Sequence, residues 1–439
     1  MKHQCAISPS INSRKTSLLG AAVLALTLFP LPAYAENSVT RWVEHALQAV
    51  RAQNVGTPDA GRLYAMTSVA MYDAVNGIEH RKHPSNGRAP ALVPPRGAPL
   101  NGNRDAAAAA AAHTVLRALA PGQAALLDAA LAGELEAAGG QKAKPVAAGR
   151  DWGQHVGEQV LALRSDDGTQ APVPIPAGTD PGEHRANFDS RWRNMLPFGV
   201  QNKFPYASQP PPALTSPEYA AAFKDVKTFG KQDCDALRNE ISNFWLAEGG
   251  TVRETGTWLQ ATLAIVEQEG TVESLPETAR LFALVGMAIA DAVMVSWEAK
   301  ATYFTWRPTV AIREAEADGN PATVPDLTWT SRIGTVGGSP EYNSGTSAFA
   351  GAASAVLEGF YCDKALSFCF ETDKASNGPR CYTSALEGAE EAGRSRIYQG
   401  IHFQFSNEDG RRAGRGIGRE IVTTRLLRNG ASARADQCR

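Results

Sequence analysis

Residues 276–305 read PETARLFALVGMAIADAVMVSWEAKATYFT, the longest stretch of the 439-residue chain in which apolar side chains recur with a helical period. Leu284, Met287 and Val295 share one face of this predicted helix because an α-helix repeats about every 3.6 residues. Asp291 falls on the same face, where a carboxylate requires a polar partner. We expect a structural partner first, with support of an active-site arginine as the alternative.

The rest of the mature chain also follows a helical pattern. Alternation of Val, Ile and Thr between turns is nearly absent, so we predict an all-α fold, a large helical bundle architecture of two packed bundles. We place a boundary near residue 215, between an N-terminal helical half (36–215) and a C-terminal half (216–439). Long irregular connections are expected at 166–215, 316–343 and 361–382. The predicted helices are 38–53, 61–77, 104–118, 122–138, 145–164, 216–229, 235–247, 252–268, 276–305, 345–360, 383–397 and 408–428.

A second acidic residue lies on an apolar helical face. Asp73 shares the inner side of the predicted helix 61–77 with Leu63, Met66 and Val69. We expect it to bond to a backbone amide or a neighbouring arginine rather than to act in catalysis.

Residues 1–35 have the features of an export signal. Arg14 and Lys15 precede an apolar run, Leu18 to Leu31, and Ala33-Tyr34-Ala35 forms a small-x-small cleavage site. No later segment approaches the roughly 20 apolar residues that a membrane span requires. We therefore predict a soluble exported protein, periplasmic or secreted.

Charge and cysteine content further restrict the class of protein. Loss of Lys2, Arg14 and Lys15 with the signal leaves 40 basic and 45 acidic side chains, a net charge of −5, which disfavours nucleic acid as a partner. Five cysteines would enter an oxidising compartment, and three of them lie between Cys362 and Cys381, where we expect a local disulfide. The odd number leaves at least one thiol free or bonded to another chain, and the pairing cannot be deduced. The five are Cys234, Cys362, Cys369, Cys381 and Cys438.

Two cations follow one another near the end of the quoted stretch. Lys300 and Arg307 are seven residues apart, so two helical turns would bring them to nearly the same face, beside Tyr303 and Trp306. Two such cations are costly unless an anion lies between them. A solvated helix edge is the alternative for this pair alone.

The segment Pro340-Glu341-Tyr342-Asn343-Ser344-Gly345-Thr346 leads into an alanine-rich helix. Gly345 would lie at the helix N-terminus, where unpaired N–H groups and the helix dipole favour an oxyanion, and the Ser344 hydroxyl adds a donor. An N-cap followed by a turn is the alternative.

The third motif is Ser395-Arg396-Ile397-Tyr398-Gln399-Gly400-Ile401-His402. On one continuous helix, His402 would point away from Arg396, so convergence of the two requires a break, for which Gly400 is suited. His402 is the only histidine after residue 184.

These three motifs, in this order and at these spacings, resemble the superfamily that unites vanadium-dependent haloperoxidases with bacterial acid phosphatases and lipid phosphatases. The segment AMTSVAMYDAVN at 65–76 and the residues from Asp291 through Trp297 to Pro308 look like those of bacterial haloperoxidase-type members.

The resemblance implies a cofactor and a set of roles. Vanadate, for which phosphate substitutes, would be neutralised by Lys300, Arg307 and Arg396, hydrogen-bonded by Ser344 and the Gly345 amide, and bonded to His402 as the vanadium ligand. The implied substrates are hydrogen peroxide, polarised by Lys300, and a halide or small organic molecule. A homodimer is compatible with the resemblance.

One residue departs from the family pattern. Members of the family typically have histidine after Ser-Gly, acting as acid or base, whereas this chain has Thr346. A threonine hydroxyl does not titrate near neutrality, so a proton-transfer contribution of roughly 10²–10⁴-fold is at risk. We therefore favour a peroxidase acting on bromide, iodide or an organic substrate rather than chloride. A phosphomonoesterase acting through a phosphohistidine and a non-catalytic oxyanion-binding protein are the alternatives.

Overall fold

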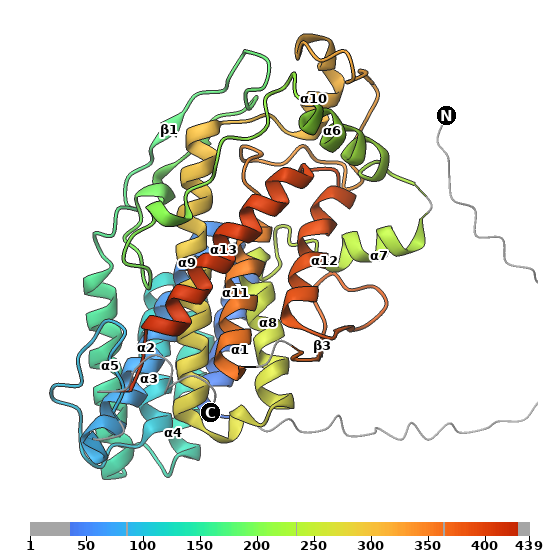
Figure 1. Cartoon of the computed structure of the whole chain (residues 1–439). Coiled ribbons are helices and arrows are strands. Elements are labelled where there is room, and N and C mark those ends of the chain that lie inside the picture. Colours follow the sequence, from blue (N-terminus) through green and yellow to red (C-terminus); the bar gives the residue numbers. More distant parts are fainter. Residues whose placement is uncertain (1–35, 85–86, 234, 363–364, 429–439) are drawn as a thin grey trace, which may run out of the picture. The chain divides into compact units, whose positions relative to one another are not determined.

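The helix at the centre of the molecule is α9, Leu275–Tyr303, in a computed structural model that describes residues 36–84, 87–233, 235–362 and 365–428 (Figure 1). It begins with Pro276, which suits the first helical turn. Among the described helices it alone is long and apolar enough by composition to cross a membrane as a single helix, yet its apolar window is entirely buried inside the protein. The helix is therefore built as a core helix of this fold.

The predicted all-α class is confirmed. Strands within the described residues are confined to two short antiparallel pairs, β1 with β2 and β3 with β4. The other elements are α1 Ser38–Gln53, α2 Thr57–Lys82, α3 Arg104–Leu119, α4 Ala124–Ala137, α5 Lys144–Leu163, α6 Pro217–Phe229, α7 Ala236–Phe244, α8 Arg253–Gln268, α10 Pro308–Arg313, α11 Gly345–Tyr361, α12 Ala385–Tyr398 and α13 Gln404–Thr424; the strands are β1 Pro174–Ile175, β2 Phe188–Asp189, β3 Phe368–Phe370 and β4 Arg380–Tyr382.

Most predicted helices recur within a few residues of their predicted ends, and the differences have local causes. Helix α9 ends at Tyr303, before the predicted end at residue 305, because Phe304 adopts a left-handed conformation with a φ of 46°. The short helix α10 then starts at Pro308, and the sequence reading missed it. Helix α13 starts at Gln404, four residues before the predicted residue 408.

Close helix contacts organise the two bundles. In the first, α3 packs on α5, where a Cβ added to Gly153 would lie 2.2 Å from the Ala107 carbonyl. In the second, α13 packs on α11, where a Cβ on Gly414 would lie 2.0 Å from the Ala348 carbonyl. Helix α2 packs against α9 and joins the bundles through one hydrophobic core. The division near residue 215 stays a prediction, although helices from both sides share this core.

The two buried aspartates have structural partners. The Asp73 carboxylate accepts hydrogen bonds from three consecutive backbone N–H groups, those of Ala91, Leu92 and Val93, at 2.7–2.9 Å. This confirms the structural role expected of Asp73.

Asp291 repeats the arrangement in α9. Its carboxylate accepts from the N–H groups of Phe198, Gly199 and Val200 at 2.7–2.8 Å. It does not contact an arginine of the site, so the alternative role considered for Asp291 is wrong. Each aspartate instead attaches a connecting segment to a core helix.

The segment after α11 contains the expected local disulfide. Cys369 and Cys381 are bonded to each other and face one another across the β3–β4 pair. Cys234 and Cys438 lie outside the described residues. Residues 1–35, with the predicted export signal, also lie outside them.

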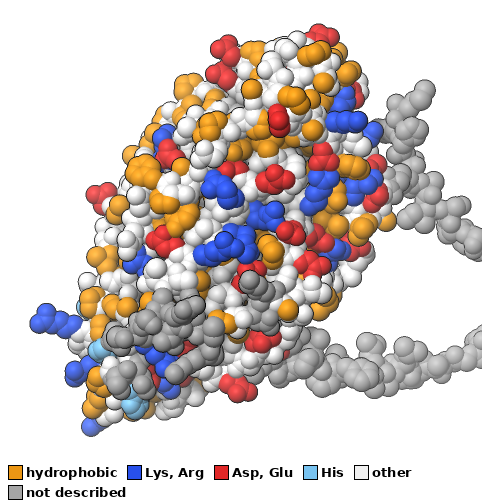
Figure 2. All heavy atoms as spheres, viewed as in Figure 1, with side chains coloured by type: hydrophobic (Ala, Val, Ile, Leu, Met, Phe, Trp, Pro, Cys, Tyr) orange, Lys and Arg blue, Asp and Glu red, His pale blue; other side chains and the backbone are white. Residues whose placement is uncertain are grey.

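Charged side chains of both signs are interspersed on the face that carries α13 (Figure 2). Arg411 pairs with Glu390, Arg412 with Asp409 at 2.8 Å, and Arg415 with Glu358 at 2.9 Å. These three arginines of α13 are therefore neutralised locally rather than forming one basic field.

Candidate functional site

Lys300 and Arg307 meet at one pocket, although not by the predicted route. Lys300 lies in the last turn of α9, whereas Arg307 is the extended N-cap residue of α10, beyond the left-handed Phe304. Two turns of a single helix therefore do not explain their proximity, which arises from the chain reversal between the helices. Lys300 is 2 % exposed and Arg307 is 5 % exposed.

The start of α11 supplies the second motif. Ser344 is its N-cap, and its hydroxyl accepts hydrogen bonds from the Ser347 N–H and from the Ser347 hydroxyl. Gly345 lines the pocket, whereas Ser344 is not one of the lining residues. Capping uses the Ser344 oxygen as an acceptor and leaves its hydroxyl proton to donate, so a hydrogen bond from Ser344 to an oxyanion stays a prediction.

The helix that carries the third motif ends before His402, as predicted. Helix α12 ends at Tyr398, and Gly400 has a φ of +80°, so the chain turns before His402. A Cβ at Gly400 would lie 2.4 Å from the Gly230 carbonyl. A glycine is required here both for the conformation and for the close approach. The turn allows Arg396 and His402 to reach the same pocket.

The oxyanion pocket is a small cavity of about 90 Å³ in which the three motifs converge. Its lining includes six of the seven residues predicted from the sequence, all except Ser344. The lining residues are Thr57, Glu254, Trp297, Lys300, Arg307, Ser339, Gly345, Thr346, Phe349, Arg396 and His402.

His402 is held by a buried carboxylate. Its Nδ1 lies 2.8 Å from Oε1 of Glu341, and its Nε2 lies 3.0 Å from Nη1 of Arg307. Because arginine can only donate, Nε2 must accept and the ring proton lies on Nδ1. Burial, followed by the charges of Arg307, Lys300 and Arg396, lowers the pKa of His402 well below its ordinary value. The imidazole is therefore neutral, with Nε2 as its basic atom.

Glu341 was missed as a functional residue by sequence reasoning. It is fully buried, and Oε1 also accepts from the Phe403 N–H at 3.0 Å. Burial raises the pKa of Glu341 to about 7. Its place three residues before Ser344 was visible in the sequence, but nothing in that spacing linked it to His402.

The three cations are only partly satisfied by the protein. Lys300 donates to the Pro340 carbonyl at 2.6 Å, and Arg307 donates to the Ser339 and Ile401 carbonyls at 2.7 Å. Nε and Nη1 of Arg396 are buried without a hydrogen-bond partner. These donors indicate that the pocket is built for an acceptor, because unpaired buried donors are costly.

Burial also changes the acidity of these cations. It lowers the pKa of Lys300 well below its ordinary value, with Arg307 as the next cause, and lowers the pKa of Arg307 to about 10. The pKa of Arg396 is lowered as well, again by burial. A bound anion would offset this cost of holding three positive charges together.

Two lining residues come from distant parts of the chain. Glu254 of α8 is the only carboxylate in the lining; Arg396 Nη2 lies 3.6 Å from its Oε1, and the Thr57 hydroxyl donates to its Oε2 at 2.8 Å. Neither Thr57 nor Glu254 belongs to the three motifs, so sequence spacing gave no signal for them. Thr346 lines the same pocket and brings only a hydroxyl to it.

The fold and the pocket together define an all-α protein with a buried pocket lined by three basic side chains, Lys300, Arg307 and Arg396. Residues 280–428 match the family model of the VCPO second helical-bundle domain. No curated protein matches the chain by sequence. Similar solved structures are known, and at the identities found the likeness is one of fold.

A bacterial vanadium-dependent iodoperoxidase is similar with a TM-score of 0.69 and 20 % identity, over 90 % of this chain and 97 % of that chain. The holo form of a bacterial vanadium-dependent chloroperoxidase is similar with a TM-score of 0.62 and a sequence identity of 13 %. The match covers 84 % of this chain and 92 % of that chain. An apo form of such a chloroperoxidase is similar with a TM-score of 0.65 and a sequence identity of 14 %, over 84 % of this chain and 93 % of that chain. Residues 280–428 thus match the VCPO second helical-bundle family, and the chain as a whole has the same fold as these bacterial haloperoxidases.

Proposed function

We propose that this chain is a vanadate-dependent peroxidase that uses hydrogen peroxide to oxidise bromide, iodide or a small organic molecule. The observation that carries the proposal is the convergence of Lys300, Arg307, Arg396 and the basic Nε2 of His402 on one pocket of about 90 Å³. The superfamily and the peroxidases of similar fold support the same conclusion.

The donors present fit vanadate. The unpartnered Nε and Nη1 of Arg396, with Lys300, Arg307 and the Gly345 N–H, would hold its oxygens, and His402 Nε2 would be its protein ligand. When bound, vanadate would supply an electrophilic centre at which hydrogen peroxide is activated. Phosphate has the same shape and would compete for the same donors.

The residues around these donors have separate tasks in the proposal. Glu341 keeps the ring proton of His402 on Nδ1, so that Nε2 stays available. Lys300 and Arg307 provide positive charge where negative charge develops. Glu254 is the lining group that can hold and release a proton in place of the histidine that Thr346 replaces.

The test combines metal content with turnover. Protein incubated with orthovanadate should retain vanadium after desalting and should brominate a phenolic dye when bromide and hydrogen peroxide are added. His402→Ala should abolish bromination, whereas His155→Ala, the same change at an exposed position of α5, should not. Bromination that persists after vanadate is removed would sink the proposal.

Phosphate-ester hydrolysis is the second candidate, and the carboxylate of Glu254 beside Arg396 favours it, because a leaving alkoxide needs a proton. Release of nitrophenol from an aryl phosphate, competitive inhibition by vanadate and a trapped phosphohistidine would select it. Tight anion binding measured by calorimetry without either turnover would select the non-catalytic alternative.

We further propose that the protein is exported, since the signal-like segment 1–35 and a disulfide between Cys369 and Cys381 are both typical of exported proteins. Fractionation of expressing cells should recover a shortened chain outside the cytoplasm. A full-length chain retained in the cytoplasm would contradict this proposal.

A further inference from the structure

The oxyanion pocket is lined by a carboxylate as well as by cations. Glu254, in the first turn of α8, lines it together with Lys300, Arg307 and Arg396. Its side chain is 17 % exposed, compared with 8 % for that of Arg396, so the carboxylate is open to a ligand. A negative group in a site for an anion requires an explanation, because like charges repel.

One oxygen of this carboxylate is held by the protein, and the other can still accept a hydrogen bond. Oε2 accepts from the Thr57 hydroxyl at 2.8 Å. Oε1 lies 3.6 Å from Nη2 of Arg396, a distance that suits an ion pair but is too long for a hydrogen bond. No residue in the described part of the chain donates a hydrogen bond to Oε1. Thr57 therefore holds the carboxylate while Oε1 remains an acceptor.

The cations of the pocket differ from Glu254 in that they can only donate. Lysine and arginine side chains carry N–H donors and no acceptor. An oxyanion without a proton would suit these donors but would place a negative oxygen beside Oε1 of Glu254. An oxyanion with one O–H group can direct its other oxygens to the cations and donate its proton to Oε1. The lining of the pocket therefore fits a protonated oxyanion better than a fully deprotonated one.

Glu254 also acts on the three cations electrostatically. Burial lowers the pKa of each of them, and the charge of Glu254 acts in the opposite direction on all three. Neutralisation alone would explain a carboxylate at this place, but it would not require that Oε1 be left without a donor. Selection by hydrogen bonding and neutralisation by charge predict different results for two anions of equal charge.

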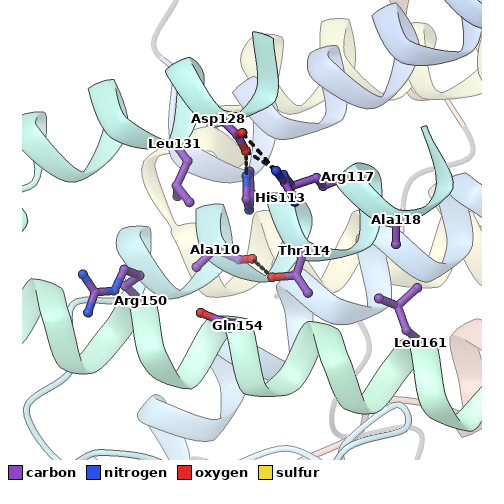
Figure 3. Close-up of a pocket in the computed structure, with 10 residues that line it drawn as sticks. All are labelled: Ala110, His113, Thr114, Arg117, Ala118, Asp128, Leu131, Arg150, Gln154 and Leu161. Atoms are coloured by element: carbon purple, nitrogen blue, oxygen red, sulfur yellow. Dashed lines mark hydrogen bonds and ion pairs between the residues drawn. The ribbon is translucent and has the colours of Figure 1, made fainter. Parts of the chain in front are cut away.

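A carboxylate in another cavity shows the contrast. In the cavity of about 440 Å³ among α3, α4 and α5, both oxygens of Asp128 accept from Arg117, at 2.9 and 3.3 Å (Figure 3). Oδ1 of Asp128 also lies 2.7 Å from Nε2 of His113. Asp128 is thus engaged by the protein through both oxygens, and this cavity does not indicate a ligand.

We propose that Glu254 makes the oxyanion pocket selective for oxyanions that carry a proton, such as hydrogen phosphate or protonated vanadate, over deprotonated ones such as sulfate. The O–H group of the bound anion donates a hydrogen bond to Oε1 of Glu254, while its other oxygens accept from the cations. Sulfate has the same tetrahedral shape but no proton near neutral pH, so it meets an unpaired carboxylate. This selectivity rests on the proposed function, since it concerns the same site.

The first experiment is calorimetric titration of the vanadate-free protein with inorganic phosphate and with sulfate. The pH is set where phosphate is a dianion, so that the two anions have the same charge and differ in the proton. Wild type should bind hydrogen phosphate at least about tenfold more tightly than sulfate, the effect of one hydrogen bond to a charged group. Equal affinities for the two anions would overturn the proposal.

Glu254→Gln separates selectivity from charge. Glutamine keeps the size of the side chain, loses the negative charge and can donate to sulfate through its amide N–H groups. The preference for phosphate should fall by at least about tenfold, mainly through tighter sulfate binding. Loss of the charge alone would tighten binding of both dianions equally, so an unchanged ratio of affinities would also overturn the proposal.

Asp128→Asn is the matched control, because it makes the same chemical change in the other cavity, and it should alter neither affinity. The wild-type ratio does not depend on the folding of any variant, and no measurement uses turnover. Phosphate binding without a preference over sulfate would contradict the selectivity alone. Absence of binding of both anions would contradict the oxyanion site, and with it both this proposal and the proposed function.

Discussion

Replacement of Asp291 by alanine tests how the central helix is attached to its surroundings. The carboxylate is fully buried and accepts three hydrogen bonds from consecutive N–H groups at 198–200. Truncation would leave three donors without their acceptor in a region that is itself buried. It would also detach this segment from α9, the helix whose last turn carries Lys300.

The expected loss of stability in Asp291→Ala follows from the number of N–H donors that lose their acceptor. Each buried donor that loses its acceptor costs about 1–3 kcal/mol, so three give a loss of roughly 3–9 kcal/mol before relaxation. Removal of a buried carboxylate and entry of water would offset part of this loss. We expect Asp291→Ala to lower the free energy of unfolding by about 3–5 kcal/mol, near the upper end for single substitutions.

The same carboxyl group makes stability depend on pH. Burial raises the pKa of Asp291 from 3.8 to about 6, so over this range the folded protein binds more protons than the unfolded chain. Its stabilising contribution is full below about pH 4 and is lost as the pH rises through about 6, by up to about 3 kcal/mol. Asp291→Asn lacks this titration, so the stability of wild type relative to Asp291→Asn should fall between pH 4 and 7.

Urea unfolding followed by far-ultraviolet circular dichroism measures both effects. Asp151→Ala is the control, since that carboxylate is 65 % exposed and should change stability by less than about 0.5 kcal/mol. A loss below about 1 kcal/mol in Asp291→Ala would refute the attachment argument. A wild-type to Asp291→Asn difference that does not vary with pH would refute the titration argument.

Three further predictions concern the pocket, the helix contacts and the disulfide. Glu254→Gln should lower the rate of bromination by roughly 10²–10⁴-fold while the vanadium content is unchanged. Adding Thr346→His to this variant should restore part of the rate. Unchanged turnover in Glu254→Gln would contradict the proton-transfer role of Glu254. Gly414→Ala should lower the free energy of unfolding by about 1–3 kcal/mol in thermal unfolding, because the new Cβ would lie 2.0 Å from the Ala348 carbonyl. The control Gly133→Ala in α4 meets nothing within 4 Å and should be neutral or stabilising. Equal effects of the two substitutions would contradict close packing of α13 on α11. Replacing Cys369 and Cys381 together by serine should cost about 3 kcal/mol for a loop with a sequence separation of 12, and a melting temperature unchanged from wild type would exclude that contribution.

The helices could be predicted because their signal is local. The periodic stretch 38–53 coincides with α1, and Gly400 marked the end of α12 that lets the chain turn toward His402. The order and spacing of the three motifs also indicated which residues share the pocket. In each case the information lies within a few turns of one helix or in the motif itself.

The tertiary structure alone decided the partners. Glu254 and Thr57 reach the pocket from α8 and α2, Asp291 bonds to a segment more than 90 residues earlier, and Glu341 meets His402 across 61 residues. Helical periodicity specifies which face of a helix is apolar, but not which distant face packs against it. Side chains that meet only through helix packing leave no spacing in the sequence. For that reason the cations of the pocket were predicted, whereas Glu254 in its lining and Glu341 behind His402 were not.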